Sequence, residues 1–354
     1  MKIIDRYITV ILLKTSAVAM LVLLALFAFL SLIDQLGDVG RGQYDVLKVI
    51  EYVLLTLPRL TYELIPVAAM IGGMTTLGIL ARNSELVIIR TSGISSFRLA
   101  FSMMQGGGLI VLAAVVVGEL VAPYSEQTAQ DMRSVALSEQ ITLNTRNGFW
   151  SRDGSSFINI RKILPGDQVK DIYIYEFDAD ARLRASTYAR QGRYVDDQWI
   201  LEDIEQSNIG NEMVTGKESK LAAWESLLNP GVINLVTIKP DYLTFRGLLE
   251  YITYLKQNGQ NSQRYEQALW SKLVSPFTIL ALIVLAVPLV RSHGRTVAVG
   301  QSIFIGCLTG LVFHIINQIS GQMGMVYSIN AVISATLPTI VVVCVTAWLL
   351  HRGV

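Results

Sequence analysis

Long blocks of apolar residues divide this 354-residue chain, and they contain no Asp, Glu, Lys or Arg. Hydrophobic residues make up 52% of the chain and charged residues only 16%, which is too apolar for an ordinary soluble protein. A spanning helix needs about 20 apolar residues, so the last block is long enough for two spans. A weak break at Gly321 to Asn330 divides that block. The sequence therefore predicts six spanning helices, within Thr15–Ile33, Ile65–Ala81, Leu99–Gly118, Leu273–Val290 and Thr296–Leu350.

Basic residues collect in the short connections on one side of these spans. Short loops rich in Lys and Arg stay in the cytoplasm, whereas acidic residues have little effect on orientation. The pattern therefore predicts cytoplasmic termini and places the polar segment from Pro123 to about Gln267 on the outer side. The basic residues concerned are Lys2, Arg6, Lys14, Arg82, Arg90, Arg98, Arg291, Arg295 and Arg352.

A charged island from Arg82 to Phe97 separates the second and third apolar blocks. Asn83 and Ser84 are suitable residues for a helix start, and Gly93 is a suitable stop. Residues at helical spacing form an apolar ridge with a charged residue toward each edge: Leu86, Ile89, Gly93 and Phe97, with Glu85 and Arg90. We predict a short cytoplasmic helix at about residues 84–97 that sits in a groove of another protein. An ordinary loop resting at the lipid headgroups is the alternative.

The outer segment has the pattern of a β-domain between helices. A helical stalk is predicted at Pro123–Gln140, and helix returns at Asp241–Gln267. Short strands of alternating polarity are typical of a sandwich or open barrel, whose interior is either an ordinary packed core or a place for a lipid chain. The predicted strands are Ser156–Ile163, Asp171–Phe177, Ser186–Val195, Gln198–Ile209, Leu221–Leu228 and Val232–Ile238. The chain thus divides into residues 1–122, 123–267 and 268–354.

Charged residues also lie near the outer ends of the spans. Arg59 and Glu63 fall between two prolines of the second span, and Glu119 ends the third. Ionisable residues at such depth are functional candidates by default. The alternative is an ion pair between Arg59 and Glu63, four residues apart on one helix, which only neutralises itself. Glu119 is a second possible partner for Arg59.

The fifth predicted span has a stripe of small and polar residues along one face. The stripe comprises Gly306, Gly310, His314, Asn317 and Gly321. Small residues allow close helix packing, so the stripe is expected to face protein or a polar cavity rather than lipid. His314 is a possible proton carrier or metal ligand, but packing and hydrogen bonding are the commoner roles of a lone intramembrane histidine.

Catalytic motifs are missing from the sequence. It contains no phosphate-binding loop, no zinc-protease motif, no nucleophile elbow and no cluster of His, Cys and Asp. The three histidines all lie outside the outer segment, which excludes a Ser-His-Asp hydrolase there. Cys307 and Cys344 lie in apolar blocks, which disfavours both a disulfide and a thiolate metal site. We expect a protein that is not an enzyme, binds no metal, cofactor or nucleic acid, and receives energy from another subunit.

Short sequence pieces in a fixed order resemble the LptF/LptG permease family of the lipopolysaccharide export ABC transporter. Each piece alone is weak, but their order and spacing together are specific. They are Asp5-Arg6-Tyr7, Asp34-Gln35-Leu36, Ser84-Glu85-Leu86, Ser92-Gly93, Gly118-Glu119, Val121-Ala122-Pro123, Gly148-Phe149-Trp150, Tyr254-Leu255-Lys256, Gly259-Gln260, Arg264-Tyr265 and Trp270-Ser271-Lys272.

The resemblance implies a helical inner-membrane protein of six spans with an inserted all-β periplasmic domain of the β-jellyroll kind. Such a permease pairs with an LptF-like permease over a dimer of LptB-like ATPase, which uses ATP and Mg. It takes lipopolysaccharide from the outer leaflet and passes it through the β-domain toward LptC-like and LptA-like proteins, for outer-membrane biogenesis.

The resemblance also implies roles for individual residues. The coupling helix would contact the ATPase through Glu85, Leu86, Ile89, Arg90 and Phe97. Basic residues would bind the lipid anion: Arg59, Arg133, Arg41 and Lys48. The lateral gate toward the partner permease would include Gly306, Gly310, His314 and Asn317. The sequence departs from the family pattern where other members carry Lys or Arg, at Ser31, Gly37, Asp38 and Gln130, and Arg41 and Lys48 are expected to compensate.

Two hypotheses from other classes fit the same pattern. One is a membrane-anchored structural or signalling protein whose β-domain binds a partner while the cytoplasmic helix contacts a regulator. The other is a mechanotransmitter that drives a periplasmic partner without moving lipid.

Overall fold

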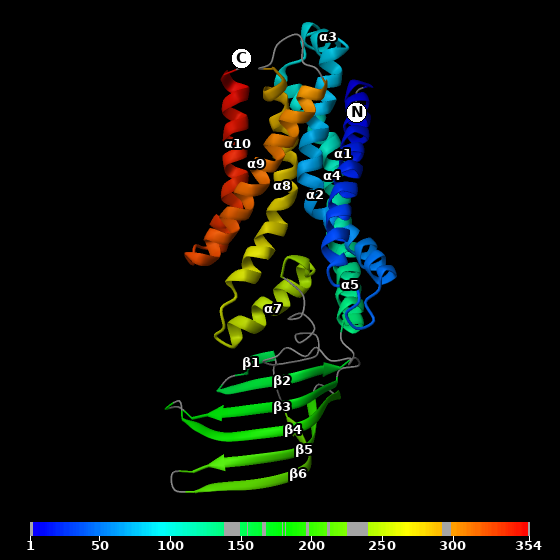
Figure 1. The fold of residues 1–354 in the computed structure, drawn as a ribbon. Helices are drawn as coiled ribbons and strands as arrows, with labels where there is room; N and C mark the ends of the chain where they lie inside the picture. Colours follow the sequence, from blue (N-terminus) through cyan, green and yellow to red (C-terminus); the bar gives the residue numbers. More distant parts are fainter. Residues whose placement is uncertain are drawn as a thin grey trace.

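The helices of the computed structural model form a long bundle, and a β-sheet lies beyond one end of it (Figure 1). Both chain termini lie at the opposite end, beside the short helix α3 (Figure 1). We call these two ends the sheet end and the termini end. The structure describes residues 3–137, 149–153, 155–164, 168–178, 180, 182–195, 198–210, 213–224, 240–291 and 299–352.

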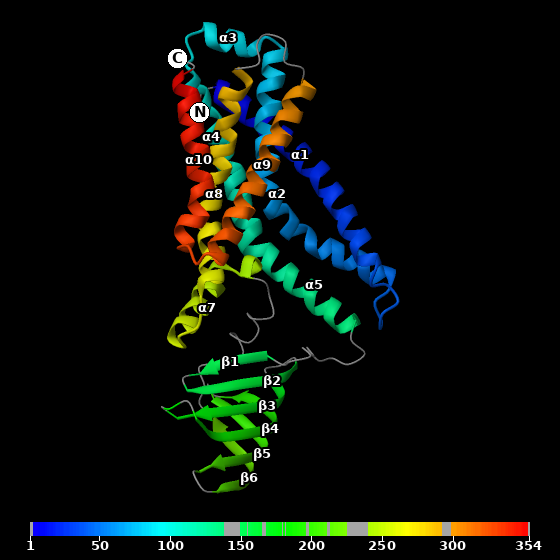
Figure 2. The same cartoon turned by 60° about the vertical axis from the view of Figure 1, so that its left-hand side comes forward.

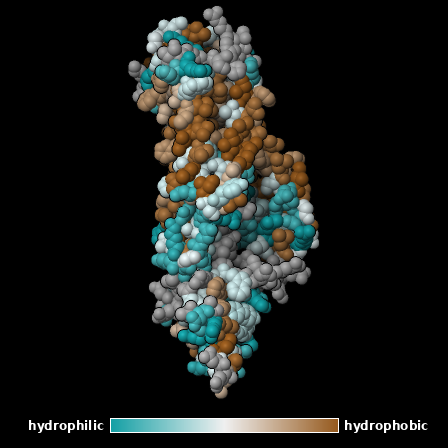
Figure 3. Space-filling model, turned by 90° about the vertical axis from the view of Figure 1, so that its left-hand side faces the viewer, coloured by the Kyte–Doolittle hydropathy of each residue, from teal (hydrophilic) through white to brown (hydrophobic). Residues whose placement is uncertain are grey.

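Six helices of the described chain are long and apolar enough to cross a membrane, which confirms the predicted number. Hydrophobic side chains form a band over these helices, as Figure 3 shows. The helices are α1 (Ile3–Leu36), α2 (Val46–Arg82), a third made of α4 (Ser96–Val116), η1 (Val117–Val121) and α5 (Ala122–Leu137), α8 (Gln263–Arg291), α9 (Val299–Val326) and α10 (Ala331–Arg352).

Two of these helices continue past the predicted domain limits. The third runs without a break through Pro123, and α8 begins at Gln263, inside the predicted outer segment. At both predicted limits the chain therefore stays helical: η1 passes into α5 at Ala122, and residue 267 lies inside α8. The predicted stalk forms the last part of the third span helix.

α2 is the central helix of the bundle, and it packs against α1, α8 and α9. The contact with α1 is close because Gly72 has no side chain. A Cβ added at Gly72 would lie 2.0 Å from Ser16 Oγ and 2.7 Å from Ser16 Cα. Beside it, the Thr15 hydroxyl donates to the Gly72 carbonyl at 2.9 Å and bonds Thr76 at 2.8 Å. Glycine and hydroxyl side chains thus hold the two helices together where no hydrophobic driving force acts between them.

The helices separate into two groups toward the sheet end. α1, the first part of α2 and α5 lean away from α7 and α8, as Figure 2 shows. A small apolar cluster of Tyr44, Val49 and Ala136 holds the first group together. The backbone N–H of Gln43 also donates to the Ala136 carbonyl at 2.7 Å. At the sheet end, these three helices therefore form one packed unit.

The described strands form one antiparallel sheet whose order follows the sequence, β1 to β6. This confirms an all-β insertion, but the described strands are a simple up-and-down sheet rather than the two packed sheets of a sandwich. β1 was not predicted, and the predicted strand Val232–Ile238 lies outside the described residues. The strands are β1 (Phe149–Asp153), β2 (Ser156–Leu164), β3 (Gln168–Phe177), β4 (Leu183–Val195), β5 (Gln198–Ile209) and β6 (Val214–Trp224).

One row of residues interrupts the regular pairing across β2 to β6. Pairing is recorded on both sides of this row but not within it, and its charges alternate in sign from strand to strand: Arg161, Asp171, Arg190, Asp203 and Lys220. Asp171 and Asp203 have φ of 54° and 52°, which reverses the alternation of side chains along each strand. Buried residues consequently lie three apart across the row, as in Ile204 and Leu201. The apolar face continues past an interruption that strict alternation would not allow.

The helix α7 (Phe245–Gln257) joins the sheet to the bundle, and it follows a single turn, η2 (Pro240–Tyr242). Tyr251, Tyr254 and Leu255 on α7 belong to the sheet core. The opposite side of α7 packs on α8 through a separate apolar cluster. α7 therefore contacts both the sheet and the spans, with one face toward each.

Candidate functional site

The first candidate site is α3, Glu85–Thr91, at the termini end of the bundle (Figure 1). The helix lies within the predicted segment but is shorter than predicted. Ser84 has φ of 61° and makes no capping hydrogen bond, so its predicted capping role is wrong. The Asn83 side chain instead donates to Glu85 Oε1 at 3.0 Å. Glu85 and Arg90 are both half-buried.

The apolar ridge predicted for a partner faces this chain's own bundle. Leu86 and Ile89 are buried, and Leu86 belongs to the main apolar core. Val87 and Ile88 are the exposed apolar residues of α3, with 54% and 65% of their surface accessible. Phe97 is also exposed and belongs to α4. Periodicity identified the ridge correctly, but only the packing of α3 on the bundle reveals which face remains available.

A buried acid ties α1 to the start of α4, and sequence reasoning did not single it out. Asp5 is 1% exposed and accepts two hydrogen bonds from Arg98, at 3.0 and 2.8 Å. Ser102 donates a third to the same carboxylate at 2.6 Å. The available signal was an acid one turn into a span, which needs a buried partner.

The second candidate site lies around Arg59 near the sheet end. Arg59 donates to the Tyr242 hydroxyl at 2.8 Å and stacks on its ring, and its Nε lies 3.5 Å from Glu126 Oε2. Glu63 Oε1 is 3.9 Å away, so the ion pair expected within α2 is present but is the longer one. Gln130 donates to the fully buried Glu126 at 2.7 Å. Burial, together with the charge of Glu63, raises the pKa of Tyr242 to about 12.

The other basic residues predicted to bind the lipid lie farther out. Arg133 and Arg41 share the carboxylate of Asp38, at 2.8 and 2.6 Å. Arg41 is 72% exposed, so this group presents an excess positive charge at the surface. Lys48 instead pairs with Glu51 at 2.9 Å, one turn along α2, and both are exposed. Asp38 therefore holds two arginines at once.

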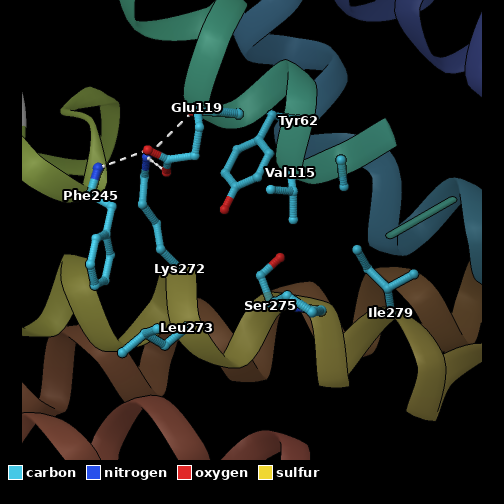
Figure 4. A pocket seen from close by; sticks show the side chains of 11 residues that line it. Tyr62, Val115, Glu119, Phe245, Lys272, Leu273, Ser275 and Ile279 are labelled. Carbon is cyan, nitrogen blue, oxygen red and sulfur yellow. Dashed lines mark hydrogen bonds and ion pairs between the residues drawn. The ribbon is translucent and has the colours of Figure 1, made fainter. Parts of the chain in front are cut away.

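Glu119 pairs with Lys272 of α8 and not with Arg59, the partner that the sequence suggested. Glu119 Oε1 lies 2.6 Å from Lys272 Nζ, and Glu119 Oε2 accepts from the backbone N–H of Phe245 at 2.8 Å. Figure 4 shows this contact above a cavity of about 390 Å³ between α4 and α8. Tyr62 lines the same cavity, whose surface is mostly apolar.

The small and polar stripe of α9 is divided between two environments. Gly306 and Gly310 are buried against α2, where an added Cβ would meet α2 atoms at 3.0 Å. His314 and Asn317 are exposed. The two glycines therefore pack within this chain, and only His314 and Asn317 are available to a partner. Among the described residues, no three His, Cys, Asp or Glu side chains come together as a metal site.

Six helices long and apolar enough to cross a membrane, with a sheet inserted between the third and the fourth, define a multi-pass membrane protein with a β-domain. A family model described as "Lipopolysaccharide export system permease LptF/LptG" matches residues 6–352. The permease protein LptG of Escherichia coli K12 is 32% identical over 353 residues, which cover 99% of this chain and 98% of that protein. The LptG of Haemophilus influenzae is 32% identical over 350 residues, or 98% of each chain. LptF of E. coli K12 is 21% identical over 301 residues, 81% of this chain and 78% of LptF. The chain belongs to the LptF/LptG family.

Proposed function

We propose that this chain is a permease subunit that moves lipopolysaccharide out of the inner membrane toward the outer membrane. The observation that carries the proposal is its match to curated LptG permeases over nearly their full length. The structural or signalling alternative is not favoured, because these relatives are export permeases. The sheet lies beyond one end of the spans, with α7 between them, which supports a transfer of lipid from the spans to the sheet (Figure 2).

The energy source in this proposal is a separate dimeric ATPase, LptB-like, that binds ATP and Mg. It docks on α3, which then lies in the cytoplasm with both termini. The exposed residues Val87 and Ile88 fill the ATPase groove, and Glu85 supplies the charge at its edge. Leu86 and Ile89 transmit the contact to the bundle because they pack beneath it.

The coupling role of α3 has a direct test. Glu85→Lys is expected to reduce lipopolysaccharide transport strongly while the chain still inserts in the membrane, because it reverses the only acidic charge of α3. Lipopolysaccharide at the cell surface and the amount of permease in the membrane are measured together. Thr91→Ala, at the far end of α3, is the control. Normal surface lipopolysaccharide in Glu85→Lys would contradict this role.

The anionic groups of the lipid are proposed to meet Arg41 and Arg133. Arginine forms paired, charge-assisted hydrogen bonds with phosphate, and these two side chains share a single carboxylate. Arg133→Ala is expected to weaken photocrosslinking of lipopolysaccharide to the bundle. Arg246→Ala is the control, since it also removes one positive charge, from an exposed ion pair with Glu250 on α7. Equal crosslinking in wild type and Arg133→Ala would reject this assignment.

The remaining partners follow from the same proposal. A second permease, LptF-like, contacts the exposed polar positions His314 and Asn317 of α9. Both α9 and α1 pack against α2. The sheet lies in the periplasm and hands the lipid to LptC-like and LptA-like proteins. Purification from native membranes in mild detergent tests the assembly. An ATPase and a second six-span permease in stoichiometric amounts are expected, whereas isolation of the chain alone or with a kinase or protease would contradict it.

A further inference from the structure

The segment that returns from the sheet to the bundle is held at two points by charged residues of the spans. Tyr242, in η2, accepts a hydrogen bond from Arg59 of α2 at 2.8 Å. Three residues later, the backbone N–H of Phe245 donates to Glu119 at 2.8 Å. Phe245 is the first residue of α7, whose unpaired N–H groups and positive dipole end favour a carboxylate. Both contacts connect residues more than a hundred positions apart in the sequence.

The position of Glu119 is fixed by an irregularity in the third span. Glu119 lies in η1, a single π-helical turn, and such turns are frequent at functional sites. Gly118 permits the ring of Tyr62 to lie against the backbone, since an added Cβ would be 2.5 Å from that ring. Lys272, which is only 8% exposed, approaches both Glu119 and the Gly118 carbonyl. The π-helical turn therefore directs one carboxylate to α8 and to the start of α7 at once.

The third span helix connects the two parts that move in the proposed function, α3 at one end and α7 with the sheet at the other. α4 begins five residues after α3 and continues through η1 to Glu119. Beyond Glu119, α7 packs on the sheet core, and its Tyr254 hydroxyl bonds Ser151 of β1 at 2.6 Å. The cavity beside Glu119 and Lys272 leaves the pair unpacked on one side (Figure 4). These contacts form a continuous path from the start of α4 through Glu119 to α7 and the sheet.

We propose that Glu119 and Lys272, with Arg59 bonded to Tyr242, form a joint that transmits movement of the third span to α7 and the sheet. This inference rests on the proposed function, because it assigns the joint to the step in which lipid passes from the spans to the sheet. The three charged side chains are positioning residues, which act on the lipid path by placing α7. They need not touch the lipid.

The test compares ATP hydrolysis with lipid delivery in the complete transporter. The complex is reconstituted in liposomes containing lipopolysaccharide, and transfer to a purified periplasmic acceptor protein is measured together with phosphate release. In Glu119→Gln and Lys272→Met, hydrolysis is expected to stay near the wild-type rate while transfer falls about tenfold or more, within the range of typical coupling between sites. The double variant Glu119→Lys with Lys272→Glu can re-form an ion pair but leaves the Phe245 N–H without its carboxylate, so transfer is expected to stay low.

Controls separate this joint from a purely structural role. Arg246→Ala removes the charge next to Phe245, but the Arg246 side chain pairs with Glu250 inside α7. This variant is expected to change neither ATP hydrolysis nor lipid transfer. Tyr242→Phe removes only the hydroxyl that binds Arg59 and must show the same split between hydrolysis and transfer. Unchanged transfer, or a parallel loss of hydrolysis, transfer and thermal stability, overturns the joint. Absence of ATP-dependent transfer in the wild type would refute the proposed function instead.

Discussion

Asp5 offers a quantitative test of how α1 is attached to the helix that follows α3. Asp5→Ala removes two charge-assisted hydrogen bonds to Arg98 and one from Ser102. Breaking a fully buried ion pair costs about 3–5 kcal/mol, and a hydrogen bond to a charged group is worth about 1.5–3 kcal/mol. Arg98 is one-third exposed, so it is hydrated once its partner is gone. We therefore expect a loss of about 2–3 kcal/mol in stability.

Thermal denaturation of the purified transporter in detergent measures this loss. A cost of about 2–3 kcal/mol is expected to lower the unfolding midpoint by about 4–10 °C, and the scan rate is held constant because such unfolding is often irreversible. Asp5→Asn, which keeps an acceptor for Ser102, is expected to lose less. Arg246→Ala breaks an exposed ion pair and serves as control. A midpoint for Asp5→Ala equal to that of Arg246→Ala would refute the attachment.

Two further predictions concern glycine contacts. Gly118→Ala is expected to destabilise the bundle by about 1–3 kcal/mol, because its Cβ would lie 2.5 Å from the Tyr62 ring, whereas Gly108→Ala has open space and is expected to be neutral or stabilising; equal midpoints in thermal denaturation would contradict this. Gly306→Leu is expected to destabilise the isolated chain, while His314→Leu is expected to leave it stable and weaken only co-purification of the second permease. A stable Gly306→Leu chain that no longer co-purifies with the second permease would instead place the interface at the glycines.

The positions of helices and strands were largely predictable because they depend on local patterns. Apolar length predicts the six spans, and alternation predicts β5 within its observed bounds. Gly93 was predicted to end a helix, and it adopts a positive φ just after the end of α3. The strand β1 was missed because its short sequence, with Arg152 and Asp153, has no clear alternation.

Which face of a helix is exposed, and which ion pairs join distant parts of the chain, was not predictable from the same patterns. Periodicity shows that α3 has an apolar ridge, but the ridge packs inward because α3 lies on the bundle. The glycines of α9 likewise face α2 because that helix offers a matching surface. Asp5 finds Arg98, and Glu119 finds Lys272, across intervals of 93 and 153 residues. Pairing at such separation is set by the tertiary fold, which a single sequence does not specify.

The balance of charge at the sheet end separates the residues that hold the protein together from those that can attract an anion. Arg59 faces two carboxyl groups, those of Glu63 and Glu126, so it has no positive charge in excess. Lys272 is matched by Glu119 in the same way. Among the described residues, Asp38 is the one carboxylate that two arginines share, and the exposed Arg41 leaves that group open to a further anion. On the function proposed above, an anionic lipid is expected to bind at the sheet-end parts of α1, α2 and α5, while Glu119, Lys272 and Arg59 hold α7 in place beside them.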